Sequence, residues 1–279
     1  MEKRSLPDSE RDIRMTQVEA EEDNVIRATQ MVDRLPPLVG HAPIPLPLPS
    51  GAPTTPGDAD TSAPAVPFRP INRPPLPFLL IIDDNRVTFE QVRLRKANYV
   101  IGRDHGDIVI AHDGQMSGRH AELVRESRDG GFRWLLKDLG STNGTFVLVD
   151  RMKLQNGDEL LLGSRVCRFE LPESKDPKAA DTQRPTIVFY GGKHTGVRLD
   201  HDEHWIGRDP EVCGELAADD PLLDPKHALL FRNPAGKWHV QSSKGVNGVW
   251  ARVREVVLRG NCRFQLGEQQ FLFCGNDRR

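Results

Sequence analysis

The stretch that decides the fold runs from residue 99 to residue 125 and reads YVIGRDHGDIVIAHDGQMSGRHAELVR. Short β-branched and aromatic runs alternate in it with Gly, Asp and Ser, and no long segment has the 3.6-residue period of a helix. This pattern predicts short strands joined by tight turns. Further runs of the same kind are Phe78–Asp83, Phe89–Arg95, Phe132–Leu136, Thr145–Val149 and Arg165–Leu171. Regular spacing of short strands favours an all-β sandwich.

The chain repeats itself. Tyr99–Arg103 returns as His204–Arg208, and the segment His120–Leu123 returns as His227–Leu230. Asn-Gly at 143–144 and Leu-Gly at 162–163 also return, in the same order and at nearly constant separation. Collinear matches of this kind indicate a duplicated domain. The sequence therefore predicts two tandem β-sandwiches over residues 77–172 and 185–279, joined by a polar linker at 173–184.

The first 76 residues have a different composition. Most of the 22 prolines lie before residue 78, and Pro43–Pro49 alternates proline with Ile and Leu. Proline lacks an amide proton and fixes φ, so this run can form neither a helix nor a central strand. Polar and charged residues dominate the stretch before it. We therefore expect residues 1–76 to form a disordered, proline-rich arm.

Composition excludes several classes of protein. The net charge is −2, and each repeat has nearly equal numbers of basic and acidic residues, so no nucleic-acid partner is expected. No apolar run approaches the ~20 residues of a membrane span, and no signal-like apolar stretch follows Met1. The four cysteines lie far apart without a CxxC pair, which argues against zinc and disulfides. We expect a cytoplasmic protein without membrane contact, metal or cofactor.

Three predicted loops of the first repeat concentrate hydrogen-bond donors. They are Gly102-Arg103, Ser117-Gly118-Arg119-His120 and Ser141-Thr142-Asn143-Gly144-Thr145. Loops at one end of a sandwich are a common place for binding sites. A phosphate monoester has three acceptor oxygens and a charge of about −1.5 to −2, so it requires donors and a positive group. This set of residues indicates a phosphate-binding site.

These blocks resemble the forkhead-associated (FHA) family, a β-sandwich that binds phosphothreonine peptides. The resemblance covers residues 77–172, and residues 185–279 resemble a degenerate member. It implies that Arg103 and Ser117 contact the phosphate, that Thr142 adds a donor and that Asn143 binds the main chain of the peptide. Arg119 would add positive charge near the phosphate or contact the residues beside the phosphothreonine. The resemblance also implies that three residues support the loops: Gly102, His120 and Gly144.

Two departures from the family pattern affect the expected binding. Gly118 stands where many relatives carry an asparagine that also holds the ligand backbone, which would weaken binding or change which flanking residue is read. In the second repeat, Asp224 and Val246 replace the serine and the threonine, although Arg208 and Asn247 remain. A carboxylate repels a phosphate, and valine removes a donor. We expect no phosphopeptide binding by the second repeat.

The predicted function is that of a phosphothreonine-binding adaptor in signalling, acting with a Ser/Thr protein kinase on phosphothreonine-containing proteins. The alternative is a phosphate-independent scaffold that uses both sandwiches as protein-interaction surfaces. An enzyme is not expected, because no Ser/His/Asp or Cys/His set assembles. Asp138, Asp158 and Glu159 could be imagined as paired carboxylates, but we interpret them as loop-anchoring or solvated groups.

The arm itself supplies a candidate ligand. Thr29 and Thr55 lie near acidic residues and are plausible kinase substrates. A phosphorylated threonine there would fold back onto Arg103, because tethering gives a high effective concentration. The equal alternative is that the arm is a passive tether.

Overall fold

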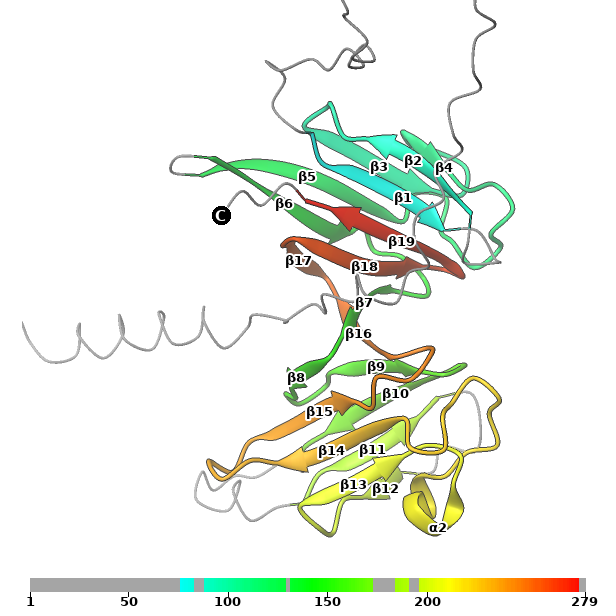
Figure 1. The fold of residues 1–279 in the computed structure, drawn as a ribbon, viewed down its shortest axis with the longest axis vertical. Helices are drawn as coiled ribbons and strands as arrows, with labels where there is room; N and C mark the ends of the chain where they lie inside the picture. Colours follow the sequence, from blue (N-terminus) through cyan, green and yellow to red (C-terminus); the bar gives the residue numbers. More distant parts are fainter. Residues whose placement is uncertain (1–75, 83–87, 129–130, 173–183, 191–195, 276–279) are drawn as a thin grey trace, which may run out of the picture.

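A computed structural model of the chain describes residues 76–82, 88–128, 131–172, 184–190 and 196–275. Nearly all regular structure in these ranges is β-strand, arranged as two stacked lobes (Figure 1), which confirms the all-β prediction. The predicted arm and linker lie outside the described residues, apart from Leu76 and Arg184. No helix within the described ranges has the length and apolar character that a bilayer span requires.

The first lobe contains the strands β1 (Phe78–Ile82), β2 (Phe89–Arg93), β3 (Asn98–Gly102), β4 (Ile108–Val109), β5 (Ala121–Arg128), β6 (Gly131–Asp138), β7 (Thr145–Val149), β17 (Glu255–Leu258), β18 (Asn261–Leu266) and β19 (Gln269–Cys274). The second lobe contains β8 (Arg151–Lys153), β9 (Glu159–Leu162), β10 (Arg165–Glu170), β11 (Thr186–Phe189), β12 (Gly196–Arg198), β13 (Glu203–Ile206), β14 (Ala228–Arg232), β15 (Trp238–Ser242) and β16 (Val249–Val253). It also holds the short helix α2 (Pro210–Cys213) and the 3-10 turn η2 (Gly214–Leu216).

Each lobe is a sandwich of two sheets. In the first, β17-β6-β5-β3-β4 faces β2-β1-β19-β18-β7, which is one half of a ten-stranded sheet. In the second, β13-β14-β15-β8 faces the other half, β16-β9-β10-β11-β12. The ring of Trp134 lies 6.2 Å from Phe273 in the first core, and Trp238 lies 6.4 Å from Phe169 in the second. Buried aromatic pairs at equivalent repeat positions therefore join the two sheets of each lobe.

The lobes do not coincide with the sequence repeats, because the repeats exchange halves. In the first lobe β1 pairs with β19, β6 with β17 and β7 with β18. The equivalent pairs in the second lobe are β11 with β10, β15 with β8 and β16 with β9. The second lobe is thus one continuous segment, and the first is built from both ends of the described chain. This differs from the expectation that residues 77–172 and 185–279 would each close on themselves.

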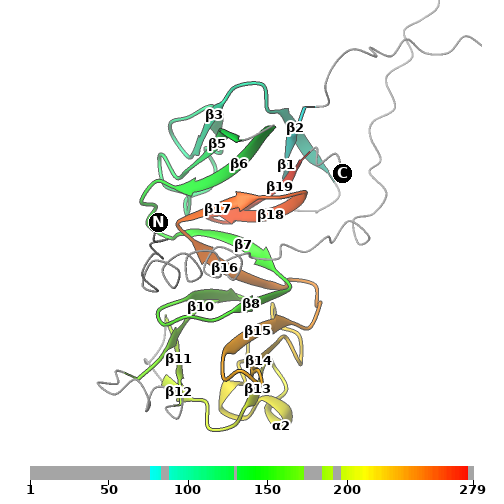
Figure 2. The same ribbon diagram turned by 90° about the vertical axis from the view of Figure 1, so that its left-hand side faces the viewer.

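Strands β7 and β16 join the lobes. They pair antiparallel with Val147 opposite Ala251, which are equivalent positions of the two repeats, so the waist has approximate two-fold symmetry. Figure 1 and Figure 2 both show these two strands side by side between the lobes. The outward-facing side chains Phe146, Leu148 and Trp250 form their own buried cluster. The outward face of these two strands is therefore also buried and apolar, except at Arg252, which is exposed.

The exchange has a local cause in the sequence. Only Asp150 separates β7 from β8, and only Arg254 separates β16 from β17. A repeat that closed on itself would have to reverse its chain direction at these points. Tight reversals favour glycine or asparagine, which adopt positive φ easily. Neither Leu148–Arg151 nor Arg252–Glu255 contains either residue. The chain therefore continues without a reversal after β7 and after β16. The second half of each repeat then pairs with the first half of the other repeat, which offers equivalent strands.

Candidate functional site

The three loops of the first lobe that carry the predicted hydrogen-bond donors lie against one another. The amide of Arg103, after β3, donates to the carbonyl oxygen of Ser117 at 3.0 Å. The amide of Thr142, between β6 and β7, donates to Oγ of Ser117 at 3.1 Å. We call Arg103, Ser117, Thr142 and Asn143 the donor cluster. Its first three members, which come from separate loops, lie together at one end of the lobe.

Arg103 is partly exposed and faces its neighbour Asp104. The Nε and Nη2 atoms of the guanidinium each lie 3.2 Å from a carboxylate oxygen of Asp104. Hydrogen bonds from Arg103 lower the pKa of Asp104, so this group is a carboxylate at neutral pH. Exposed ion pairs contribute little to stability. An incoming phosphate would therefore share or replace a weak partner of the guanidinium.

Asn143 is tied to the loop that precedes Ser117. Its Nδ2 donates to the main-chain oxygen of Gln115 at 2.8 Å and to Oε1 of the same residue at 3.0 Å. Asn143 and Thr142 are exposed, and Arg119 is exposed on the loop that carries Ser117. Sequence reasoning did not identify Gln115, because nothing in its local pattern distinguishes it from a solvated loop residue.

His120 connects two of the loops from inside the lobe. Its side chain is fully buried. Nδ1 accepts a hydrogen bond from the amide of Ser117 at 3.2 Å, so the ring proton sits on Nε2, which lies 3.1 Å from the oxygen of Gly144. Gly102 is packed equally closely, because a Cβ added there would lie 2.2 Å from the oxygen of Gly118. His120 and Gly102 thus hold neighbouring loops in contact, whereas the support that His120, Gly102 and Gly144 give to a binding site stays a prediction.

Asp138 holds the loop that carries Thr142 and Asn143. It accepts hydrogen bonds from the amides of Gly140 at 2.8 Å and Ser141 at 2.9 Å, and from Oγ1 of Thr145 at 2.7 Å. Burial by itself would raise the pKa of Asp138, but a hydrogen bond from the Ser141 hydroxyl, together with those from Thr145 and the two amides, lowers it below its usual value. The carboxylate therefore stays charged, and the interpretation of Asp138 as a loop anchor agrees with its contacts.

The two other carboxylates considered in the sequence have separate roles. Asp158 accepts a hydrogen bond from the amide of Gln155 at 2.7 Å and closes its own turn. Glu159, on β9, pairs with Arg252 of β16 at 2.5 Å. Neither contact joins these carboxylates to Asp138, so their bonding gives no support to a catalytic pair.

His120 should make the stability of the protein depend on pH. Burial lowers the pKa of His120 below its usual 6.5. A proton added at Nδ1 would face the amide donor of Ser117 and break that bond. Since the unfolded chain takes up this proton near pH 6.5 and the folded chain does so only at lower pH, the stabilising contribution is complete above pH 6.5 and is lost as the pH falls below it.

Urea denaturation between pH 8 and pH 5 measures this effect. We expect the free energy of unfolding of His120→Gln to fall less steeply with pH than that of the wild type, by up to about 1.4 kcal/mol per pH unit. If His120→Gln does not fold, an NMR titration of the wild type gives the pKa directly. A pKa of His120 at or above 6.5, or equal slopes for the two proteins, would contradict the assignment.

The equivalent site of the second repeat is closed by its own side chains. Nε of Arg208 donates to the main-chain oxygen of Leu223 at 2.6 Å. The carboxylate of Asp224 lies 3.3 Å from Nδ1 of His227. A Cβ added to Gly245 would lie 1.6 Å from Oδ2 of Asp224, so this carboxylate rests directly on the loop before Val246. A negative group thus fills the place that corresponds to Ser117 Oγ.

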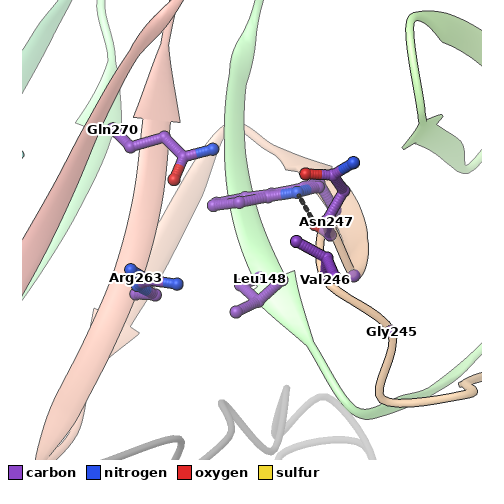
Figure 3. Close-up of a pocket in the computed structure, with 8 residues that line it drawn as sticks. Leu148, Gly245, Val246, Asn247, Arg263 and Gln270 are labelled. Atoms are coloured by element: carbon purple, nitrogen blue, oxygen red, sulfur yellow. Dashed lines mark hydrogen bonds between the residues drawn. The ribbon is translucent and has the colours of Figure 1, made fainter. Parts of the chain in front are cut away.

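Other candidate sites are weaker. Across the described ranges, no group of three or more His, Cys, Asp or Glu side chains is placed to hold a metal ion. Nε2 of His204, on β13, lies 3.1 Å from the main-chain oxygen of His201, so this ring is engaged with the bend that precedes its own strand. A pocket at the waist is lined by Leu148, Trp250 and Arg263 among others (Figure 3). It does not include the donor cluster.

Comparisons with known proteins place part of the chain beside one domain family. The family model described as FHA domain matches residues 99–163. FHA domain-containing protein FhaB of Mycobacterium tuberculosis (strain ATCC 25618 / H37Rv) is 31% identical over 87 residues, which is 31% of this chain and 52% of FhaB. FhaB of Mycolicibacterium smegmatis is 30% identical over the same length. The chain spans about half the length of the curated relatives that it matches.

Two solved structures are also similar. The Slr1951 protein from Synechocystis sp. is 30% identical, with 35% of this chain and 99% of that chain covered and a TM-score of 0.24. EmbR of Mycobacterium tuberculosis, solved with a low affinity phosphopeptide, is 26% identical, with 36% of this chain and 26% of that chain covered and a TM-score of 0.21. The family match includes every residue of the donor cluster and runs from β3 through β9. The chain therefore carries a domain of the FHA family.

Proposed function

We propose that this chain binds phosphothreonine peptides through the donor cluster and serves as a non-enzymatic adaptor in signalling by a Ser/Thr protein kinase. The observation that carries the proposal is the meeting of Arg103, Ser117 and Thr142 at one end of the first lobe. Arg103 supplies a fixed positive charge, and its planar guanidinium suits two phosphate oxygens at once. The match of residues 99–163 to the FHA domain model supports the proposal.

Ser117 is prepared to donate to a phosphate. A hydroxyl has one proton and two acceptor lone pairs. Since Oγ of Ser117 already accepts from the amide of Thr142, its own proton is available for a ligand oxygen. Asn143, oriented by Gln115, is placed to bind the main chain of the peptide beside the phosphothreonine. Without the phosphate, nothing offsets the entropy lost when an extended peptide becomes ordered.

Under this proposal the second repeat does not bind a phosphopeptide. Asp224 would repel a phosphate at the very place where Ser117 would donate to one. It also keeps the hypothesis that Thr29 or Thr55 of the arm, once phosphorylated, occupies the donor cluster of the same chain. In both cases the chemical requirement is a phosphorylated threonine in an extended segment.

A peptide-library experiment on the full chain tests the proposal. An oriented phosphothreonine library and the same library treated with phosphatase are passed over immobilised protein. We expect retention of phosphorylated peptides only, with a Glu-containing mimic library retained poorly because it brings one charge and a flat carboxylate.

The alternative, a phosphate-independent scaffold, has one observation in its favour. The second repeat keeps its sandwich but replaces two donors of the site, as Asp224 and Val246 show. Equal retention of the treated and untreated libraries, or capture of protein partners that phosphatase does not change, would favour the scaffold and reject the proposed function.

A further inference from the structure

Because the repeats exchange strands, the second repeat contributes β17–β19 to the first lobe, which carries the donor cluster. We infer that the phosphothreonine-binding site is composite: strands β17–β19 of the second repeat complete the first lobe within the same chain and position the loops of the donor cluster through Asp113. This inference rests on the proposed function and extends it, because it states which parts of the chain the site needs.

The first lobe is incomplete without these strands. β19 lies against all five residues of β1, from Phe78 opposite Cys274 to Ile82 opposite Gln270. β17 forms the edge of the sheet that carries β6, β5 and β3, and β18 pairs with β7. Phe271 and Phe273 of β19 are almost fully buried. Loss of such large apolar side chains from a core costs about 3–5 kcal/mol each.

Asp113 connects the turn between β18 and β19 to the donor cluster. This carboxylate is only 5% exposed. Its Oδ2 accepts from the amides of Glu268 at 2.8 Å and Gln269 at 3.1 Å. Its Oδ1 accepts from the amides of Gln115 at 2.9 Å and Met116 at 3.2 Å. One side chain therefore fixes the loop before Ser117 to a turn that belongs to the second repeat.

The connection continues to the peptide-binding residues. The side-chain Nδ2 of Asn143 donates to the main-chain oxygen of Gln115, so the path runs from the β18–β19 turn through Asp113 and Gln115 to Asn143. A second contact comes from β16. A Cβ added to Gly144 would lie 2.5 Å from Nε of Arg252, so Arg252 packs directly against the residue that follows Asn143. In both contacts a residue of the second repeat touches a loop that carries or supports the donor cluster.

The second lobe shows the same arrangement with the repeats reversed. Asp220, equivalent to Asp113, accepts from the amide of Ser164 at 2.8 Å and from its hydroxyl at 2.7 Å. Asp220 also accepts from the amide of Leu222, whose carbonyl oxygen binds Asn247. The two lobes thus offer a matched pair of carboxylates, of which only Asp113 supports a complete set of donors.

Two cysteine pairs on the full chain test the exchange. Lys137 lies opposite Glu255 across β6 and β17, whereas a repeat that closed on itself would place Arg151 opposite Lys137. Facing residues have Cα atoms about 4.5–5.5 Å apart, within the range that a disulfide needs. We expect mild oxidation to form an intrachain disulfide in Lys137→Cys/Glu255→Cys and none in Lys137→Cys/Arg151→Cys. Burial raises the pKa of Cys167 and Cys262 to about 12 and that of Cys274 to about 11, so these native thiols should react slowly.

An intrachain disulfide in Lys137→Cys/Arg151→Cys and none in Lys137→Cys/Glu255→Cys would overturn the composite site. A disulfide-linked dimer from the 137/255 pair would also overturn it, because the completing strands would then come from a second chain. This readout needs no ligand, so it stands even if the wild type binds no phosphopeptide and the proposed function fails.

Asp113→Ala and Asp220→Ala then test the coupling to binding. Both variants remove a buried anchor and should lower the thermal midpoint to a similar extent. Only Asp113→Ala should weaken binding of a phosphothreonine peptide, by tenfold or more, as measured by calorimetry at a temperature where both variants are folded. Equal affinities of the two variants, with the wild type binding, would reject the positioning role of Asp113.

Discussion

Arg103→Ala should lower the affinity for a phosphothreonine peptide by about 100-fold. The guanidinium is the one fixed positive charge in the donor cluster, and hydrogen bonds between charged groups contribute about 1.5–3 kcal/mol each. Loss of a two-pronged contact therefore removes about 3 kcal/mol, and every 1.4 kcal/mol corresponds to a factor of ten. The fold should be unaffected, because Arg103 is partly exposed and pairs only weakly with Asp104. Isothermal titration calorimetry and urea denaturation measure the two effects separately.

The chain contains a matched control for this variant. Arg208 occupies the same position in the second repeat, where the carboxylate of Asp224 lies against the loop before Val246 and would repel a phosphate. Arg208→Ala should leave the affinity within twofold of the wild type. Arg103→Lys keeps the charge but not the planar fork, so its affinity should lie between those of the wild type and Arg103→Ala. If Arg208→Ala weakened binding as much as Arg103→Ala, the assignment of the site to the first repeat would be wrong.

Much of the fold could be predicted from local sequence. Alternating burial in strands such as Asn98–Gly102 leaves a clear pattern, and the strand from residue 145 to residue 149 was expected with the bounds that the structure shows. The meeting of Arg103, Ser117 and Thr142 followed from loops at one end of a sandwich, because antiparallel strands bring alternate loops to the same end. Their contacts with a phosphopeptide remain a prediction.

The exchange of halves could not be predicted in the same way. Each repeat offers the same pairing edge, so β1 finds an equivalent partner in β10 or in β19, and strand propensity does not distinguish them. The one sequence feature that favours exchange over self-closure is the lack of a turn-forming glycine or asparagine in the segments around Asp150 and Arg254. Asp113 was missed for a related reason. Its bonds to Glu268 and Gln269 join residues far apart in sequence, and no local motif marks such a contact.

Gly102→Ala should destabilise the protein by about 3 kcal/mol and abolish phosphopeptide binding. A Cβ at this position would lie 2.2 Å from the main-chain oxygen of Gly118 and 2.9 Å from that of His105. Both neighbours are backbone atoms, which cannot rotate away as a flexible side chain can. Overpacking of this kind costs about 1–3 kcal/mol, occasionally more, because the backbone must shift. The segment that shifts carries Ser117, so the geometry of the donor cluster is lost together with the stability.

Gly114→Ala provides the control, since it lies in the same loop region and has no atom within 4 Å of an added Cβ. Its stability should stay within about 0.5 kcal/mol of the wild type, as for most surface substitutions. Chemical denaturation of both variants, with calorimetry in native buffer, gives the comparison. Because the backbone of Gly102 approaches that of Gly118 closely, a Gly102→Ala protein with wild-type stability and affinity would show that β3 and the Ser117 loop are not packed as described. A protein destabilised by about 3 kcal/mol that still bound the peptide normally would instead separate the packing of Gly102 from the position of Ser117.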